Sequence, residues 1–254
     1  MEEDLDLGID KIETKKIPKT HKEKTSFIEK SSIFLIVLVA AFILFNQIQL
    51  MQISSALGGT SYSSAGVKLV SGQAVFEVKK TGNDAQDVIN ALVPKGTPSY
   101  GAELAVSFDD PVNSLTKLAK LHRSVSTDSL SAEEKTRYIN VGTKISCEFC
   151  CSAPSVVDSH GRDLCGCSHA QSFMGLSKYL IKNHPEMTDE QILAELTKWK
   201  TLYYPKNMVQ KGVALLQNDQ PLTAEALNDR NLLKKLSTGD LGSIGELPEM
   251  VGGC

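Results

Sequence analysis

The sequence predicts a mainly α fold, in which one N-terminal transmembrane helix is followed by a helical extracytoplasmic domain with at most a small β element. Three observations lead to this prediction. An uncharged, largely apolar run lies near the N-terminus of the 254-residue chain, helix-capping motifs recur after it, and five of the six cysteines lie between Cys147 and Cys167. Hydrophobic residues make up 41% of the chain and charged residues 22%, which excludes a wholly disordered chain and a protein with many membrane spans.

Residues 31–53 are the predicted single-pass transmembrane helix. They contain no charged side chain, and as a helix they extend over about 34 Å, which exceeds a bilayer core of about 30 Å. Seven lysines lie in residues 11–30, whereas the first basic residue after the segment is Lys68. The positive-inside rule therefore predicts a cytoplasmic tail at 1–30 and a signal-anchored chain in the cell membrane, whose main domain is extracytoplasmic.

Other interpretations of the apolar run stay open. The small residues Ser54-Ser55-Ala56 would allow a signal peptide to be cleaved after the apolar core, although its leader would be unusually long. A pilin-type leader would require glycine or alanine before the run, where the sequence has Lys30-Ser31. The lysine-rich approach disfavours a buried helix of a soluble domain, so the anchor is preferred.

The main domain is predicted at 67–238, after a linker of small residues at 54–66 and before an irregular, glycine-rich tail at 239–254. Partial alternation of apolar residues in 67–80 predicts a short strand or hairpin, and 95–110 is predicted as a loop. Capping residues and apolar periodicity then predict helices that begin near Asn83, Asp110, Ser131, Ser168 and Thr188, and further helices over 209–216 and 223–236.

The cysteine-rich segment predicts a metal site. It contains Cys147-Glu-Phe-Cys150-Cys151 and, after thirteen residues, Cys165-Gly-Cys167-Ser-His169. A Cys-x-x-Cys loop can place two sulfurs on one ion, and a second cysteine pair with a histidine can complete a tetrahedron. The predicted metal ligands are therefore Cys147, Cys150, Cys165, Cys167 and His169.

Within this set, the four cysteines are the expected core ligands, and His169 is the residue that would replace one of them. Cys151 is expected to be surplus, because adjacent Cys150 and Cys151 would strain a common chelate. Zinc is the predicted cofactor because tetrahedral sulfur with one imidazole suits it, and Cu(I) is the alternative because it also prefers thiolates. The ion could be stored, handed on, or used as a structural brace.

Two other functions of the cysteines stay open. Outside the membrane cysteines often form disulfides, and six cysteines could staple an interaction module, although Cys150 and Cys151 are crowded for ordinary disulfides. Cys147 and Cys150 could instead form the redox pair of a thiol–disulfide oxidoreductase, but the strand-to-helix context of such motifs is missing. Both alternatives predict a site without metal.

Around these cysteines the chain resembles an uncharacterised family of membrane-anchored prokaryotic proteins. The resemblance is carried by Ile145-Ser-Cys-Glu-Phe-Cys-Cys151 and Cys165-Gly-Cys-Ser-His169, and it extends to Tyr100–Asp110, Gly175–Leu180 and Trp199–Pro205. These segments and the chain between them amount to roughly half of the sequence. The resemblance implies a coherent domain and, since no activity is attached to the family, no mechanism.

Other functions leave no clear signal in the sequence. Phosphate-binding loops, nucleophile elbows, His-Glu-x-x-His and dinucleotide-binding motifs do not occur, so no catalytic residue is predicted. A net charge of −3 and 6% aromatic residues do not favour nucleic-acid binding. The predicted partners are thus the membrane and a metal ion, and no feature identifies a protein partner.

Overall fold

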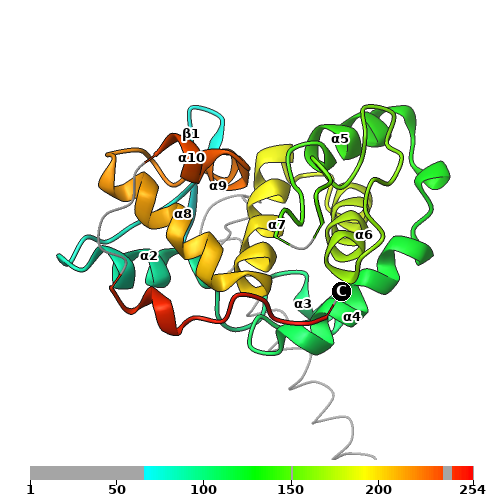
Figure 1. The fold of residues 1–254 in the computed structure, drawn as a ribbon. Coiled ribbons are helices and arrows are strands. Elements are labelled where there is room, and N and C mark those ends of the chain that lie inside the picture. The colour runs from blue at the N-terminus through cyan, green and yellow to red at the C-terminus, as the bar shows by residue number, and fades with distance from the viewer. Residues whose placement is uncertain (1–65, 150, 237–241, 254) are drawn as a thin grey trace, which may run out of the picture. The chain divides into compact units, whose positions relative to one another are not determined.

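The computed structural model describes residues 66–149, 151–236 and 242–253 (Figure 1). The predicted cytoplasmic tail, the predicted transmembrane helix and almost all of the predicted linker lie outside these ranges. Within them, no helix is both long enough and apolar enough to cross a membrane. The prediction of a mainly α domain is confirmed, because helices account for most of the regular structure and the sheet has two strands.

The elements follow one another along the chain as two strands and then a series of helices. The strands are β1 (Val67–Val70) and β2 (Gln73–Phe76), and the helices before the cysteine-rich segment are α2 (Asp84–Leu92), α3 (Gly101–Leu104), α4 (Pro111–Ser124), the 3₁₀ helix η1 (Thr127–Ser129) and α5 (Ala132–Gly142). After that segment come α6 (Ser168–Asn183), α7 (Asp189–Tyr203), α8 (Pro205–Gln217), α9 (Ala224–Asn228), α10 (Leu232–Lys235) and the 3₁₀ helix η2 (Gly242–Glu246).

The predicted hairpin is present at the start of the domain. β1 and β2 are antiparallel, with Val67 opposite Phe76. The two-residue turn between them has Ser71 and Gly72 at φ 51° and 80°, as the tight turns of twisted hairpins require. Ala74 and Phe76 are buried, whereas β1 is largely exposed. The hairpin therefore contributes one face of one strand to the core.

Helix starts agree closely with the capping signals. Asp110 accepts a hydrogen bond from Asn113 N–H ahead of α4. Ser131 and Thr188 form complete capping boxes at α5 and α7, which pair backbone donors that a helix start otherwise leaves without partners. The predicted starts of these three helices are confirmed.

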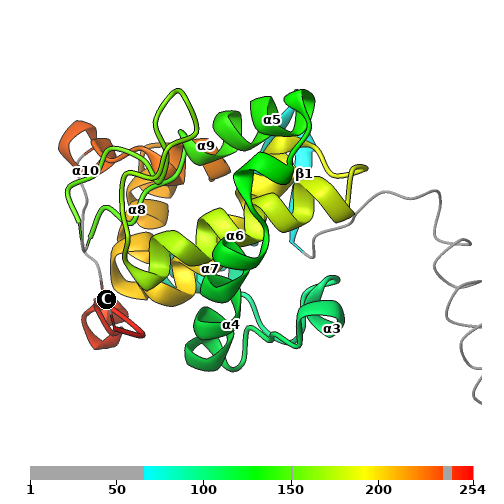
Figure 2. The same cartoon turned by 90° about the vertical axis from the view of Figure 1, so that its right-hand side faces the viewer.

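The core is built around α7. This helix lies between α6 and α8 (Figures 1 and 2) and also packs against α5 and α9. Trp199, Tyr203 and Tyr204 have no exposed surface, so these aromatic residues belong to the core. On the other side of α6, helix α4 approaches very closely at Gly175, where an added Cβ would lie 2.5 Å from the Leu118 carbonyl oxygen.

Three predictions about elements need correction. The predicted loop at 95–110 contains α3, and residues 242–246 of the predicted irregular tail form η2. The predicted helix 223–236 is broken into α9 and α10. The physical reason for the break is the buried Lys211 ammonium, which donates to the carbonyl oxygens of Leu227 and Asp229 at 3.1 and 2.8 Å. A continuous helix would use these carbonyls for its own hydrogen bonds.

Candidate metal centre

Two loops joined by a short return of the chain bring four cysteine thiols together in front of α6. The Sγ atom of Cys147 lies 3.1 Å from that of Cys151 and 3.4 Å from those of Cys165 and Cys167. The Cys151 and Cys165 sulfurs are 2.7 Å apart, and those of Cys165 and Cys167 are 3.6 Å apart. All four are free thiols. Cys147 is fully buried and the other three are half-buried.

A tight return of the chain joins the two loops. The Asp158 side chain accepts hydrogen bonds from His160 N–H and Arg162 N–H at 2.8 and 2.9 Å, and Gly161 takes a positive φ of 78°. The polar residues at 158–161 are typical of such a turn. Beyond it, Leu164 N–H donates to the Val156 carbonyl at 2.9 Å, so the chain runs back alongside itself. The return of the chain thus brings Cys165 close to Cys147.

The first loop makes a helical turn that places Cys147 and Cys151 on one side. Cys151 N–H donates to the Cys147 carbonyl at 3.3 Å, and residues four apart share one side of such a turn. Cys151, which was expected to be surplus as a ligand, therefore lies within the cluster. Cys150 lies outside the described residues, so its predicted role as a ligand stays a prediction.

Cys167 caps the helix that follows it. Its Sγ accepts a hydrogen bond from Ala170 N–H at 3.4 Å, so α6 begins at Ser168, and Ser168 is not the capping residue that the sequence predicted. The pKa of Cys167 is lowered to about 3 by a hydrogen bond from Cys147 and, less strongly, by hydrogen bonds from His169 and Ala170 N–H. A helix N-terminus also favours the thiolate, which is the form that binds metal.

The pKa values of the other three thiols shift in different directions, because these thiols share hydrogen bonds within the cluster. The pKa of Cys147 is raised, chiefly by its hydrogen bond to Cys167 and by burial. Burial also raises the pKa of Cys165, to about 11. For Cys151, burial is outweighed by hydrogen bonds from Cys165 and Cys147, which lower its pKa. The hydrogen bonds within the cluster therefore favour negative charge on Cys167 and Cys151 over Cys147 and Cys165.

The spacing of the sulfurs suits a metal better than a set of disulfides. A tetrahedral ion with bonds of about 2.3 Å holds its sulfur ligands about 3.8 Å apart, whereas a disulfide brings two sulfurs to about 2.05 Å. The sulfur–sulfur separations of 2.7 to 3.6 Å lie between these values. The sulfurs of Cys147, Cys151 and Cys165 all lie within 4.8 Å of one another, whereas Cys167 falls outside this group. One ion could be bound by all four thiolates if the closest sulfur pair moved apart by about 1 Å and Cys167 moved towards Cys151.

His169 lies behind the cluster. Its Nδ1 lies 3.0 Å from the Tyr204 hydroxyl and its Nε2 lies 2.9 Å from the Val251 carbonyl oxygen. Because that carbonyl only accepts, Nε2 carries a hydrogen, and the ring also forms a hydrogen bond with Cys167. Both ring nitrogens thus have partners, and the imidazole is fully buried. His169 supports Cys167 and the C-terminal segment, in contrast to the prediction that it replaces a thiolate ligand.

Two buried lysines lie under the first loop. The Glu148 carboxylate forms ion pairs with Lys200, at 3.4 Å, and with Lys211. The Phe149 ring lies 5.6 and 5.5 Å from the two lysine Nζ atoms. The lysines of α7 and α8 therefore lie directly beneath the segment that carries Cys147.

Sequence reasoning missed these lysines, although the helical pattern contained a signal. Lys200 lies four residues after Leu196 and three before Tyr203 on α7, and both neighbours are core residues. Lys211 lies three residues after Met208 and four before Leu215 on α8, and these neighbours are core residues too. A lysine in the middle of an apolar stripe indicates a buried charge that needs a partner.

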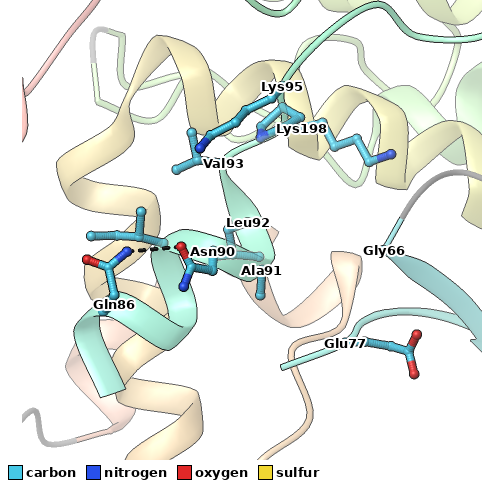
Figure 3. A pocket seen from close by; sticks show the side chains of 11 residues that line it. Gly66, Glu77, Gln86, Asn90, Ala91, Leu92, Val93, Lys95 and Lys198 are labelled. Atoms are coloured by element: carbon cyan, nitrogen blue, oxygen red, sulfur yellow. Dashed lines mark hydrogen bonds between the residues drawn. The ribbon is translucent and has the colours of Figure 1, made fainter. Parts of the chain in front are cut away.

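The domain also contains an open cavity of about 410 Å³, which is lined mainly by α2 and the residues that follow it (Figure 3). Gln86 and Asn90 form a hydrogen bond on its wall, and Lys95 and Lys198 approach it from the other side. Its lining contains neither cysteine nor histidine. The cavity therefore provides no second set of soft metal ligands.

No family model, curated protein or solved structure matches the chain. The resemblance to membrane-anchored prokaryotic proteins stays a prediction. The chemistry of the site thus depends on the residues described above, of which Cys147, Cys151 and Cys165 lie closely enough to hold one ion together.

Proposed function

We propose that this protein is a membrane-anchored, extracytoplasmic metal-binding protein whose site consists of Cys147, Cys151, Cys165 and Cys167. The observation that carries the proposal is the convergence of four free thiols from two loops, with neighbouring sulfurs 2.7 to 3.6 Å apart. Thiolate sulfur is the ligand type that zinc and Cu(I) prefer. Four sulfurs in one cluster favour a tetrahedral ion, so zinc is the first candidate and Cu(I) the second.

Accessibility supports storage or transfer of the ion as well as a structural role. Cys151, Cys165 and Cys167 are half-buried, whereas Cys147 is inside. An incoming ligand could therefore reach three of the four sulfurs without unfolding of the domain. The anchor at 31–53 and the extracytoplasmic side are parts of the proposal that depend on the distribution of lysines in the sequence.

A thiol–disulfide oxidoreductase based on Cys147 and Cys150 receives less support. An attacking cysteine needs a low pKa and access to its substrate. Cys147 has no exposed surface, and its pKa is raised by its hydrogen bond to Cys167 and by burial. Cys147 thus has the properties of an inner metal ligand.

The metal content and the free thiols of the full chain test the proposal. Chain purified anaerobically and incubated with Zn²⁺ should retain about one ion, and its clustered thiols should react with a thiol reagent only after strong chelation. Because metal binding contributes folding free energy, chelation should also lower the melting temperature. A chain that retains no metal while all six cysteines react at once, or while they are paired in disulfides, would contradict the proposal.

A further inference from the structure

The ion pairs beneath the cysteine cluster do not balance in charge. The side chains of Lys200, Lys211 and Glu148 are at most 5% exposed, so two ammonium groups face one carboxylate. The remaining partners are neutral oxygens: Asn228 Oδ1 accepts from Lys200 at 3.0 Å, and the Leu227 and Asp229 carbonyls accept from Lys211. When both lysines are protonated, one positive charge is left without a buried counter-charge.

The charged residues near this group do not supply that counter-charge. The Asp229 carboxylate, which influences Lys211, forms a partly exposed ion pair with Lys235 at 2.7 Å. Arg230 adds further positive charge in the neighbourhood of Lys211. A buried charge without a counter-charge is costly, so an arrangement of this kind calls for a negative group nearby.

The cysteine cluster is the neighbouring group that can become negative. Glu148, which pairs with both lysines, and Phe149, whose ring lies 5.6 and 5.5 Å from their Nζ atoms, are the two residues that follow Cys147 in the chain. Burial lowers the pKa of Lys200 to about 7, whereas Glu148 and Cys147 act in the opposite direction. Negative charge on the sulfurs would therefore stabilise the protonated lysine, and the lysine would stabilise that negative charge in return.

We infer that Lys200 and Lys211 are internal counter-cations that make the cysteine site selective for anionic metal–thiolate complexes. A divalent ion with four thiolates carries two negative charges, and Cu(I) with two or three thiolates carries one or two. A divalent ion held by two thiolates and two neutral ligands carries none and gains less from the lysines. This inference rests on the proposed metal-binding function. It goes further by stating the net charge of the metal–thiolate complex that the site prefers.

The inference is tested by Zn²⁺ affinity, measured by competition with a chromogenic chelator on the full chain under anaerobic, reducing conditions. Lys200→Met should weaken Zn²⁺ binding at least about tenfold, which is the lower end for outer-shell residues. Glu148→Gln removes a negative charge from the same ion-pair group, so it should leave the affinity unchanged or raise it. Lys198→Met is the matched control, because Lys198 is another buried lysine of α7 but pairs with Glu195 at 2.9 Å.

Lys200→Met and Glu148→Gln are expected to change the Zn²⁺ affinity in opposite directions, and this difference separates an electrostatic role of the ion pairs from a structural one. If Lys200 and Glu148 only anchor the loop, both variants should weaken binding to a similar extent, and that result would overturn the inference. Unchanged affinity in Lys200→Met and in Lys211→Met would overturn it as well. Lys211→Met replaces Lys200→Met if the melting curve shows that the latter is unfolded. Failure of the wild-type chain to bind Zn²⁺ would be seen first, and it would contradict the proposed function itself.

Discussion

Replacing Cys151 with serine is expected to weaken Zn²⁺ binding about 100-fold. Structural zinc sites contribute about 10–16 kcal/mol over four ligands, so one thiolate accounts for about 3 kcal/mol. Cys151 lies 2.7 Å from Cys165 and 3.1 Å from Cys147, measured between sulfurs. Competition with a chelator of known affinity measures the change.

Ser152→Ala is the matched control for this substitution, because Ser152 is the exposed neighbour of Cys151 in the same loop. It should leave the affinity unchanged. Full Zn²⁺ affinity in Cys151→Ser, together with a large loss in Cys150→Ser, would contradict the assignment and restore the ligand set that the sequence predicted.

Gly175→Val is expected to lower the free energy of unfolding by about 3 kcal/mol or more, at the upper end of the usual cost of overpacking. An added Cβ at this position would lie 2.5 Å from the Leu118 carbonyl oxygen and 2.6 Å from the His122 amide nitrogen. These are backbone atoms of α4, so they cannot move aside without separating α4 from α6. Chemical denaturation of the metal-free chain measures the effect.

The effects of alanine substitutions at Gly175 and Gly166 on the free energy of unfolding test the same packing with a smaller side chain. In a helix, alanine is about 0.5–1 kcal/mol more favourable than glycine, so Gly175→Ala would stabilise the chain if α4 and α6 were further apart. We expect net destabilisation because of the short backbone contacts. Gly166→Ala is the control: nothing lies within 4 Å of its added Cβ, so it should be close to neutral. Stabilisation by Gly175→Ala would contradict the packing of α4 on α6.

Local signals predicted the helices well because they act over a few residues. Asp110 before Pro111, and the capping boxes at Ser131 and Thr188, fix helix starts through side chains three residues away. The helix predicted over 223–236 failed for a non-local reason. Lys211, on another helix, takes carbonyl oxygens that the continuous helix would need.

In the candidate site, too, the features that depend on neighbouring residues could be predicted, whereas those that depend on distant segments could not. The sequence placed Cys147, Cys165 and Cys167 in one cluster because two cysteine-rich loops flank a predictable turn. It excluded Cys151 because a Cys-x-x-Cys pattern seemed the natural chelate, whereas the loop makes a turn that brings residues four apart together. His169 was expected as a ligand, but its partners Tyr204 and Val251 come from distant segments and could not be read from spacing.

X-ray absorption at the zinc edge of the Zn²⁺-loaded full chain tests the central claim most directly. We expect a single shell of four sulfur atoms at about 2.3 Å from the metal, supplied by Cys147, Cys151, Cys165 and Cys167. The spectrum should lack a nitrogen shell, because both ring nitrogens of His169 have other partners. A first shell dominated by nitrogen or oxygen at about 2.0–2.1 Å would contradict the account.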